Sequence, residues 1–251
     1  MGVRVNSPAE IAAMREGGKI LARIFSELKD FVQVGQTELE VDAWVEKRIY
    51  LYGATPTYKE PAVNFPGVIC ISVNDQVVHS VPTDRAFKTG DIVSFDLVIS
   101  YKGMKTDAAF TMMMGEQPTG DKKRLINATE QSLYAAIDAI KGPVYTGDIA
   151  AAVQGVLEQN QLGIIRDLVG HGIGKEMHQS PDIPNFGRAG SGTLLNTGNT
   201  IAIEPMATLG GYDVDLGRDK WTILTRDGSL AAHFEHTVLI TRDGAEILTQ
   251  L

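Results

Sequence analysis

The chain has 251 residues, of which 43% are apolar and 22% are charged, and these proportions are typical of a globular protein rather than a disordered or fibrous one. Its 23 Lys and Arg residues stand against 31 Asp and Glu residues, which gives a net charge of −8. This balance argues against direct nucleic-acid binding, because phosphate contacts need a surplus of cationic side chains. No apolar run approaches the ~20 residues that cross a bilayer, so we expect no membrane attachment.

Cysteine content and the first residues bear on the cellular compartment. Cys70 is the only cysteine, which excludes an intramolecular disulfide and leaves no set of cysteines for a structural zinc site. Residues 1–6 lack the apolar core of a secretion signal. We therefore expect a protein of the cytoplasm, where thiols stay reduced.

The first half of the chain is predicted to form two helices followed by strands. The capping-box segment Ser7–Glu10 opens the first helix and places proline at its first position. Thr37 and Glu40 repeat the capping pattern before a second helix, which Gly53 would end. The strands that follow are predicted at 68–73, 91–100 and 105–114, the last two joined by a turn at 101–103.

The second half repeats this order. Helices are predicted at 121–141 and 146–163, and strands near 164–169, 200–203 and 234–241. The segment Thr89–Asp96 also lines up with Thr197–Glu204, which indicates an internal duplication. We expect pseudo-twofold symmetry, with Asp96 and Glu204 at equivalent strand ends facing one central cavity. No Ser- or Gly-rich linker separates the halves, so residues 1–251 are predicted to form a single domain.

Asp96 and Asp107 lie in the two strands of the predicted hairpin. With the turn centred between residues 101 and 102, they would oppose each other directly, so both carboxylates are expected on one sheet face. The opposite face is apolar, as expected for packing under helices, and carries Phe95, Leu97, Ile99, Phe110 and Met112. A bridging divalent cation would relieve the repulsion between the two carboxylates. The alternative is a solvated hairpin edge with two ordinary aspartates.

Glu204 and Glu235 interrupt two other apolar strands. A charge in such a run is seldom buried unless it is paired or bound to metal, and the alternative is an edge strand with the carboxylate in water. His171 lies in a Gly-His-Gly-Ile-Gly segment, where the glycines allow close backbone approach, although a histidine among glycines is also typical of an ordinary turn. His178 follows, and a returning loop could present both histidines to one site.

Four carboxylates and one imidazole form an oxygen-rich ligand set. Such a set suits two divalent ions of Mn, Fe, Co or Zn rather than a structural zinc ion. Two ions that share a hydroxide generate a nucleophile at neutral pH and polarise a carbonyl. These residues therefore predict metal-assisted hydrolysis.

The ordered set of candidate ligands resembles that of the pita-bread metallopeptidases, and in particular of type I methionine aminopeptidases. The resemblance rests on the GHGIG segment around His171, the Glu-His-Thr run at 235–237, and the order and spacing of the set Asp96, Asp107, His171, Glu204 and Glu235. It covers nearly the whole chain and implies an α+β fold, in which two helix–helix–strand halves surround a central antiparallel sheet. It also implies removal of the N-terminal methionine from peptides and nascent proteins with a small second residue, by attack of a water activated by two metal ions.

The resemblance assigns a role to each candidate ligand. Asp96 would bind one ion, and Asp107 and Glu235 would bridge both. His171 and Glu204 would complete the shell of the other ion. Glu204 would also act as general base or proton shuttle.

Two further histidines match functional residues of the family. His178 would contact the scissile carbonyl and stabilise the tetrahedral intermediate, an oxyanion-type role. His79 matches the histidine that contacts the backbone amide and helps to position the substrate.

The methionine pocket departs from the family pattern. Cys70 and Trp221 resemble family pocket residues, although a small core residue and a loop-packing residue are the plain alternatives. Phe65 stands where tyrosine is common, Ala62 where bacterial enzymes often carry tyrosine, and Met177 where phenylalanine is usual. Methionine is flexible and makes favourable sulfur contacts, so the substrate side chain should still fit. The departures leave the shape of the pocket and its tolerance of the second residue open.

Two other functions compete with a methionine aminopeptidase. An X-Pro aminopeptidase of the same fold is disfavoured by the Glu-His-Thr run and by the lack of a separate N-terminal domain. A non-catalytic relative that binds a protein or RNA partner is disfavoured because all five ligands are present. We expect a monomer that meets nascent chains in transient proximity to the ribosome.

Overall fold

The computed structural model describes residues 3–251. Residues 1 and 2, which belong to the segment predicted to lack a secretion signal, lie outside the described residues. The helices are α1 (Pro8–Phe31), α2 (Glu38–Leu51), α3 (Gly120–Asp138) and α4 (Thr146–Gln159), with a 3-10 turn at Thr57–Lys59. Within residues 3–251, none of them is both long and apolar enough to cross a membrane.

The first two helices begin where the capping boxes predict. The Ser7 hydroxyl accepts a hydrogen bond from the Glu10 backbone N–H at 3.3 Å, and the Glu10 carboxylate accepts one from the Ser7 N–H at 2.9 Å. Thr37 and Glu40 make the same reciprocal pair at the start of α2. Each box satisfies backbone donors that a helix leaves unpaired at its first turn.

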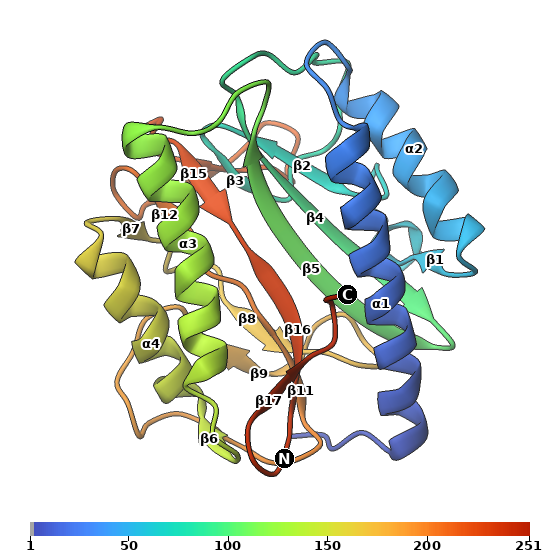
Figure 1. Cartoon of the computed structure of the whole chain (residues 1–251), viewed down its shortest axis with the longest axis vertical. Helices are drawn as coiled ribbons and strands as arrows, with labels where there is room; N and C mark the ends of the chain where they lie inside the picture. Colours follow the sequence, from blue (N-terminus) through green and yellow to red (C-terminus); the bar gives the residue numbers. More distant parts are fainter. Residues whose placement is uncertain (1–2) are drawn as a thin grey trace.

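A large antiparallel sheet runs through the molecule in the order β1-β4-β5-β16-β11-β8-β9, with β2 beside β4 and β17 beside β16 (Figure 1). Its strands are β1 (Thr55–Pro56), β2 (Cys70–Val73), β4 (Ile92–Tyr101), β5 (Met104–Met113), β8 (Gly170–Gly172), β9 (Gln179–Ile183), β11 (Thr200–Ile203), β16 (Glu235–Ile240) and β17 (Ala245–Ile247). The two strands that carry the repeated segments, β4 and β11, lie outside the central β5–β16 pair, one on each side. This arrangement confirms the predicted α+β fold with two related halves around an antiparallel sheet.

Residues 3–251 also form three small sheets. They contain β3 (Gln76–Val78), β6 (Val144–Tyr145), β7 (Gly163–Ile164), β10 (Leu194–Leu195), β12 (Met206–Thr208), β13 (Val214–Leu216), β14 (Ile223–Thr225) and β15 (Ala231–His233). Their pairing orders are β10-β6, β15-β12-β7 and β13-β14-β3.

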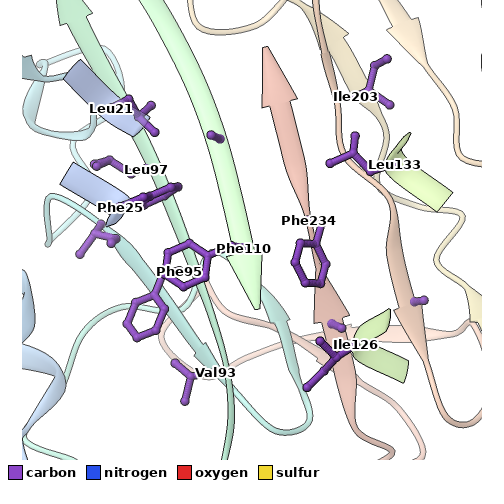
Figure 2. Close-up of a cluster of buried hydrophobic side chains, with 14 of the residues drawn as sticks. Leu21, Phe25, Val93, Phe95, Leu97, Phe110, Ile126, Leu133, Ile203 and Phe234 are labelled. Carbon is purple, nitrogen blue, oxygen red and sulfur yellow. The ribbon is translucent and has the colours of Figure 1, made fainter. Parts of the chain in front are cut away.

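Helices α1 and α3 pack over the strands of the large sheet, and apolar side chains fill the space beneath them (Figures 1 and 2). Phe25 of α1 meets Phe110 of β5 edge to face, with ring centroids 4.8 Å apart, and Phe110 lies 5.3 Å from Phe95. Leu133 of α3 lies near Phe234 in the same cluster of buried side chains. The face of the β4–β5 hairpin that was predicted to pack under helices therefore does so, and the other face is left for the site.

The register of the hairpin differs from the prediction. Asp96 pairs with Ala109, and Asp107 pairs with Val98, so the two aspartates are diagonal neighbours rather than direct partners. The turn consists of Lys102 and Gly103, which both have positive φ, at 50° and 76°. Two such residues form a tight two-residue loop, which shifts the pairing from the expected centre. Because the shift keeps the parity of the strands, both carboxylates still share one face.

Other predicted boundaries are also corrected. The strand expected at 68–73 begins only at Cys70, because the Val68 and Ile69 N–H groups donate to the Asp42 carboxylate instead of to a strand. The strand expected at 164–169 is reduced to β7, after which Ile165 stays buried and Arg166 and Asp167 are exposed. Asp96 lies in the middle of β4 and not at a strand end, whereas Glu204 directly follows β11.

Two glycines test how closely the helices pack. A Cβ on Gly18 of α1 would overlap the carbonyl oxygen of Leu248, whereas a Cβ on Gly155 of α4 would meet nothing within 4 Å. We expect Gly18→Ala to lower the free energy of unfolding by about 1–3 kcal/mol through overpacking. Gly155→Ala should raise it by about 0.5–1 kcal/mol through helix propensity. Urea unfolding of both variants measures the two values, and equal effects would contradict the packing of α1 against the C-terminal segment.

Candidate metal centre

One row of residues across the large sheet carries three of the four carboxylates. Asp96 of β4 pairs with Ala109 of β5, which in turn pairs with Glu235 of β16. Glu204 follows β11 and extends the row, because β11 and β16 pair up to the preceding residue. Since residues paired across strands share a face, these three carboxylates emerge on the face away from α1.

The neighbouring row carries the fourth carboxylate and the imidazole. The Thr237 hydroxyl accepts a hydrogen bond from the Asp107 backbone N–H and donates one to the Asp107 carbonyl, each at 2.8 Å. Ala202 pairs with Thr237 on one side and with His171 on the other. Small residues at Ala109 and Ala202 separate the longer side chains and leave room above the sheet between them.

His171 presents a free nitrogen lone pair to the carboxylates. Its Nδ1 lies 3.0 Å from the carbonyl oxygen of Gly172. Because a carbonyl oxygen only accepts, Nδ1 carries the hydrogen and donates a hydrogen bond to this oxygen. Its Nε2 lies 3.4 Å from Glu204 Oε1 and 3.9 Å from Asp107 Oδ2. Burial lowers the pKa of His171 to about 4, so the ring is neutral at pH 7. A lone pair that faces two carboxylate oxygens is the arrangement of a metal ligand.

The charge of the site calls for a cation. Burial raises the pKa of Asp96 to about 7, and burial with repulsion from neighbouring carboxylates raises the pKa values of Asp107, Glu204 and Glu235 well above their usual range. Asp107 Oδ1 and Glu235 Oε1 are buried and have no hydrogen-bond partner within residues 3–251. Ligand atoms of Asp107, His171 and Glu235 lie within 4.8 Å of one another. Orphaned carboxylate oxygens with a histidine lone pair fit a divalent cation.

The other two histidines predicted to function, His79 and His178, lie beside this centre. The β8–β9 segment returns on itself and brings the His178 ring to 4.4 Å from the His171 ring, edge to face. His79 follows β3 with a φ of 58°. Together with Glu204, they line a cavity of about 270 Å³. Burial lowers the pKa of His79 to about 4, so its ring is a neutral donor and acceptor at pH 7.

The residues predicted to form the methionine pocket also gather in one place. Phe65 and Cys70 are buried in an apolar cluster against which Met177 and Trp221 pack. The Phe65 and Trp221 rings meet edge to face at 5.3 Å. Ala62 lies at the exposed mouth and lines a groove with Met177 and Trp221. Cys70 pairs in register with Asp96, so the cluster adjoins the carboxylate row directly.

Comparisons with known proteins identify the family. The model of metallopeptidase family M24 matches residues 12–242. A methionine aminopeptidase of Clostridium perfringens is 42% identical over 240 residues, which cover 96% of each chain. The chain belongs to the methionine aminopeptidases of metallopeptidase family M24. The crystal structure of the methionine aminopeptidase from Thermotoga maritima matches with a TM-score of 0.95 and 40% identity, over 99% of this chain and 100% of that one.

A more distant structure shares the fold alone. Prolidase from Pyrococcus furiosus matches with a TM-score of 0.77 at 23% identity, and the match covers 98% of this chain and 65% of that one. Membership of family M24 indicates a metal-dependent hydrolase. The predicted family, fold and enzyme class are therefore confirmed.

Two residues of this M24 peptidase escaped the sequence analysis. The Tyr58 hydroxyl donates a hydrogen bond to Asp96 Oδ1 at 2.9 Å, and burial raises the pKa of the phenol well above its usual range, so it stays a donor. His233 Nε2 lies 3.8 Å from Glu235 Oε2, with both side chains almost fully buried. His233 precedes a predicted ligand by two residues, a spacing that could have marked it, whereas nothing local to Tyr58 indicates its partner.

Metal binding to this centre is expected to displace protons. Because the pKa of Asp96 is raised to about 7 and those of its carboxyl neighbours are raised as well, the metal-free site holds protons below that pH. We expect Mn²⁺ to bind more tightly as the pH rises from 6 to 8. Calorimetric titration in two buffers of different ionisation enthalpy measures the released protons. A binding heat that does not depend on the buffer would contradict this account of the site.

Proposed function

We propose that this enzyme removes the N-terminal methionine from peptides and nascent proteins whose second residue is small. The observation that carries the proposal is that the row of carboxylates, which fits a cation, adjoins an apolar pocket. The two meet where Cys70 of the pocket pairs with Asp96 of the row across β2 and β4. The methionine aminopeptidase of Clostridium perfringens, at 42% identity, supports the same activity. We also propose that residues 1–251 act as one catalytic domain.

Two divalent ions, each Mn, Fe, Co or Zn, are proposed as the cofactor. Asp96 would hold one ion, Asp107 and Glu235 would be shared, and His171 and Glu204 would complete the ligands of the other ion. Four carboxylates balance the charge of two dications, which a buried site tolerates better than either set alone. When bound, such ions supply Lewis-acid chemistry for hydrolysis of a peptide bond.

The chain's own residues would bind and orient the peptide. His178, beside the His171 ring, would donate a hydrogen bond to the scissile carbonyl and stabilise the oxyanion that develops there. His79 would contact the backbone amide of the substrate. Glu204 lines the same cavity and would take up and return the proton of the attacking water.

The side chain of the substrate methionine would enter the apolar cluster. Phe65, Cys70, Met177 and Trp221 supply aromatic and sulfur surface, which suits a thioether. Ala62 leaves the mouth of the pocket open. The small second residue of the substrate would lie at the cavity of His79 and His178.

The proposed setting follows from composition. A net charge of −8 and a single buried cysteine suit a monomer in the cytoplasm, without direct contact to nucleic acid or membrane. Its substrates would be peptide and nascent-chain N-termini, met in transient proximity to the ribosome.

Peptide hydrolysis separates this function from its alternatives. We expect metal-stripped protein resupplied with Mn²⁺, Co²⁺ or Fe²⁺ to release methionine from Met-Ala-Ser and to leave Ala-Pro-Ala intact. Cleavage of the proline peptide would instead support an X-Pro aminopeptidase. Stable metal binding without cleavage of either peptide would support a binding protein.

Two controls belong to this assay. Chelator should abolish the release, and Asp107→Asn should weaken both metal binding and turnover, because it removes one charge shared by both proposed ion positions. Full activity of the chelated protein would contradict a metallopeptidase.

A His178 variant tests the oxyanion role. We expect His178→Ala to lower kcat on Met-Ala-Ser by about 100-fold, the usual effect of removing one oxyanion donor. Its affinity for Mn²⁺ should stay unchanged, because His178 is not among the proposed ligands. His178→Gln, which keeps an N–H donor, should recover part of the rate. A loss of metal affinity equal to the loss of kcat would contradict the assignment.

A further inference from the structure

Tyr58 joins the apolar pocket to the carboxylate row. It lies in the 3-10 turn Thr57–Lys59 between α2 and β2, and it is 6% exposed. Its hydroxyl donates to Asp96 Oδ1 at 2.9 Å, and Asp96 is also 6% exposed. A hydrogen bond between two buried groups, one of them a carboxyl group, fixes that group more firmly than an exposed hydrogen bond would.

The Tyr58 ring is part of the pocket wall. Its centroid lies 5.2 Å from that of Phe65, which in turn meets Trp221. Tyr58, Phe65 and Cys70 belong to one buried cluster. One side chain thus touches the surface that would receive the substrate side chain and the carboxylate that would hold an ion.

The loop that carries Tyr58 is tied to the sheet. The Phe65 N–H donates to the Tyr58 carbonyl at 3.0 Å, which closes the loop on itself. Glu60 forms an ion pair with Lys105 of β5 at 3.0 Å, and the Lys105 ammonium also donates to the Lys175 carbonyl at 3.1 Å. Lys105 is almost fully buried, whereas the Glu60 side chain is 36% exposed, so the tether is buried at its sheet end. The loop therefore follows the position of β5, the strand that carries Asp107.

We propose that Tyr58 is a positioning residue for Asp96 and that it couples packing in the methionine pocket to metal binding. Packing against Phe65 fixes the position of the Tyr58 ring and therefore of its hydroxyl group. The hydroxyl group then sets the orientation of the Asp96 carboxylate toward the ion. Coupling of this kind is reciprocal, so an ordered pocket strengthens metal binding and bound metal orders the pocket. The inference rests on the ligand and pocket assignments of the proposed function.

The first test is metal affinity without any peptide. Tyr58→Phe keeps the ring and removes the hydroxyl, and we expect it to raise the Kd for Mn²⁺ by about tenfold, as for other hydrogen-bond partners of metal ligands. Tyr52→Phe is the matched control, because the Tyr52 hydroxyl also donates to a carboxylate, that of Glu27, in a solvent-accessible groove of α1 and α2. Its Kd should stay within twofold of the unaltered protein. Calorimetric titration of the metal-stripped full chain gives all three values.

The second test is a double-mutant cycle with the pocket. Phe65→Ala removes the packing against the Tyr58 ring, and we expect it to weaken Mn²⁺ binding severalfold when Tyr58 is present and not in the Tyr58→Phe background. Phe65→Leu replaces it if the alanine variant does not fold. The visible absorption of the Co²⁺-loaded protein should change with Tyr58→Phe and stay constant with Tyr52→Phe.

Two results overturn the proposal. One is a Kd for the Tyr58→Phe variant within twofold of the unaltered protein, and the other is a Phe65→Ala effect of equal size in both backgrounds. If Tyr58→Phe lowers thermal stability but leaves the Kd for Mn²⁺ unchanged, Tyr58 has only a structural role. This outcome also overturns the proposal. The metal-affinity test uses no peptide, so its outcome does not depend on the peptide assay. Failure of the unaltered protein to release methionine would refute the proposed function and would leave the test of Tyr58 valid.

Discussion

Repulsion among four carboxylates, three of them buried and one partly exposed, is the constraint on which the rest of this structure depends. Asp96, Asp107, Glu204 and Glu235 share one sheet face. Burial raises the pKa of each, and repulsion from neighbouring carboxylates raises the pKa values of Asp107, Glu204 and Glu235 further. Without a cation, the folded chain must hold protons on these groups or bear their repulsion. The scaffold must therefore be stable enough to keep the set together until metal binds.

The other face of the sheet supplies that stability. Aromatic rings from α1, β4 and β5 interlock, and aliphatic side chains of α3 belong to the same buried cluster (Figure 2). A strand alternates its side chains between the two faces, so Asp96 is flanked by Phe95 and Leu97, which anchor it in the core. The duplicated halves meet at the β5–β16 pair, where Ala109 and Glu235 face one another. The site thus lies at the seam between the halves and not within either one.

Local signals in the sequence predicted much of this arrangement. The capping boxes placed the starts of α1 and α2, and the alternation of β4 and β5 placed both aspartates on one face. The predicted partner of Asp96 was wrong by two residues, because the register depends on the backbone conformation of Lys102 and Gly103, which composition does not determine. Tyr58 could not be found, since its role depends on a loop whose path is set by distant contacts such as the pair of Glu60 and Lys105.

The two-residue turn of the β4–β5 hairpin has a consequence for errors of strand pairing. Side chains alternate along a strand, so sliding β5 by one residue past β4 would point Asp107 into the aromatic core and Phe110 into the site. A loop of only two residues, Lys102 and Gly103, has no spare length to absorb such a slip. The turn therefore keeps the charged side chains and the apolar side chains on their separate faces of the sheet.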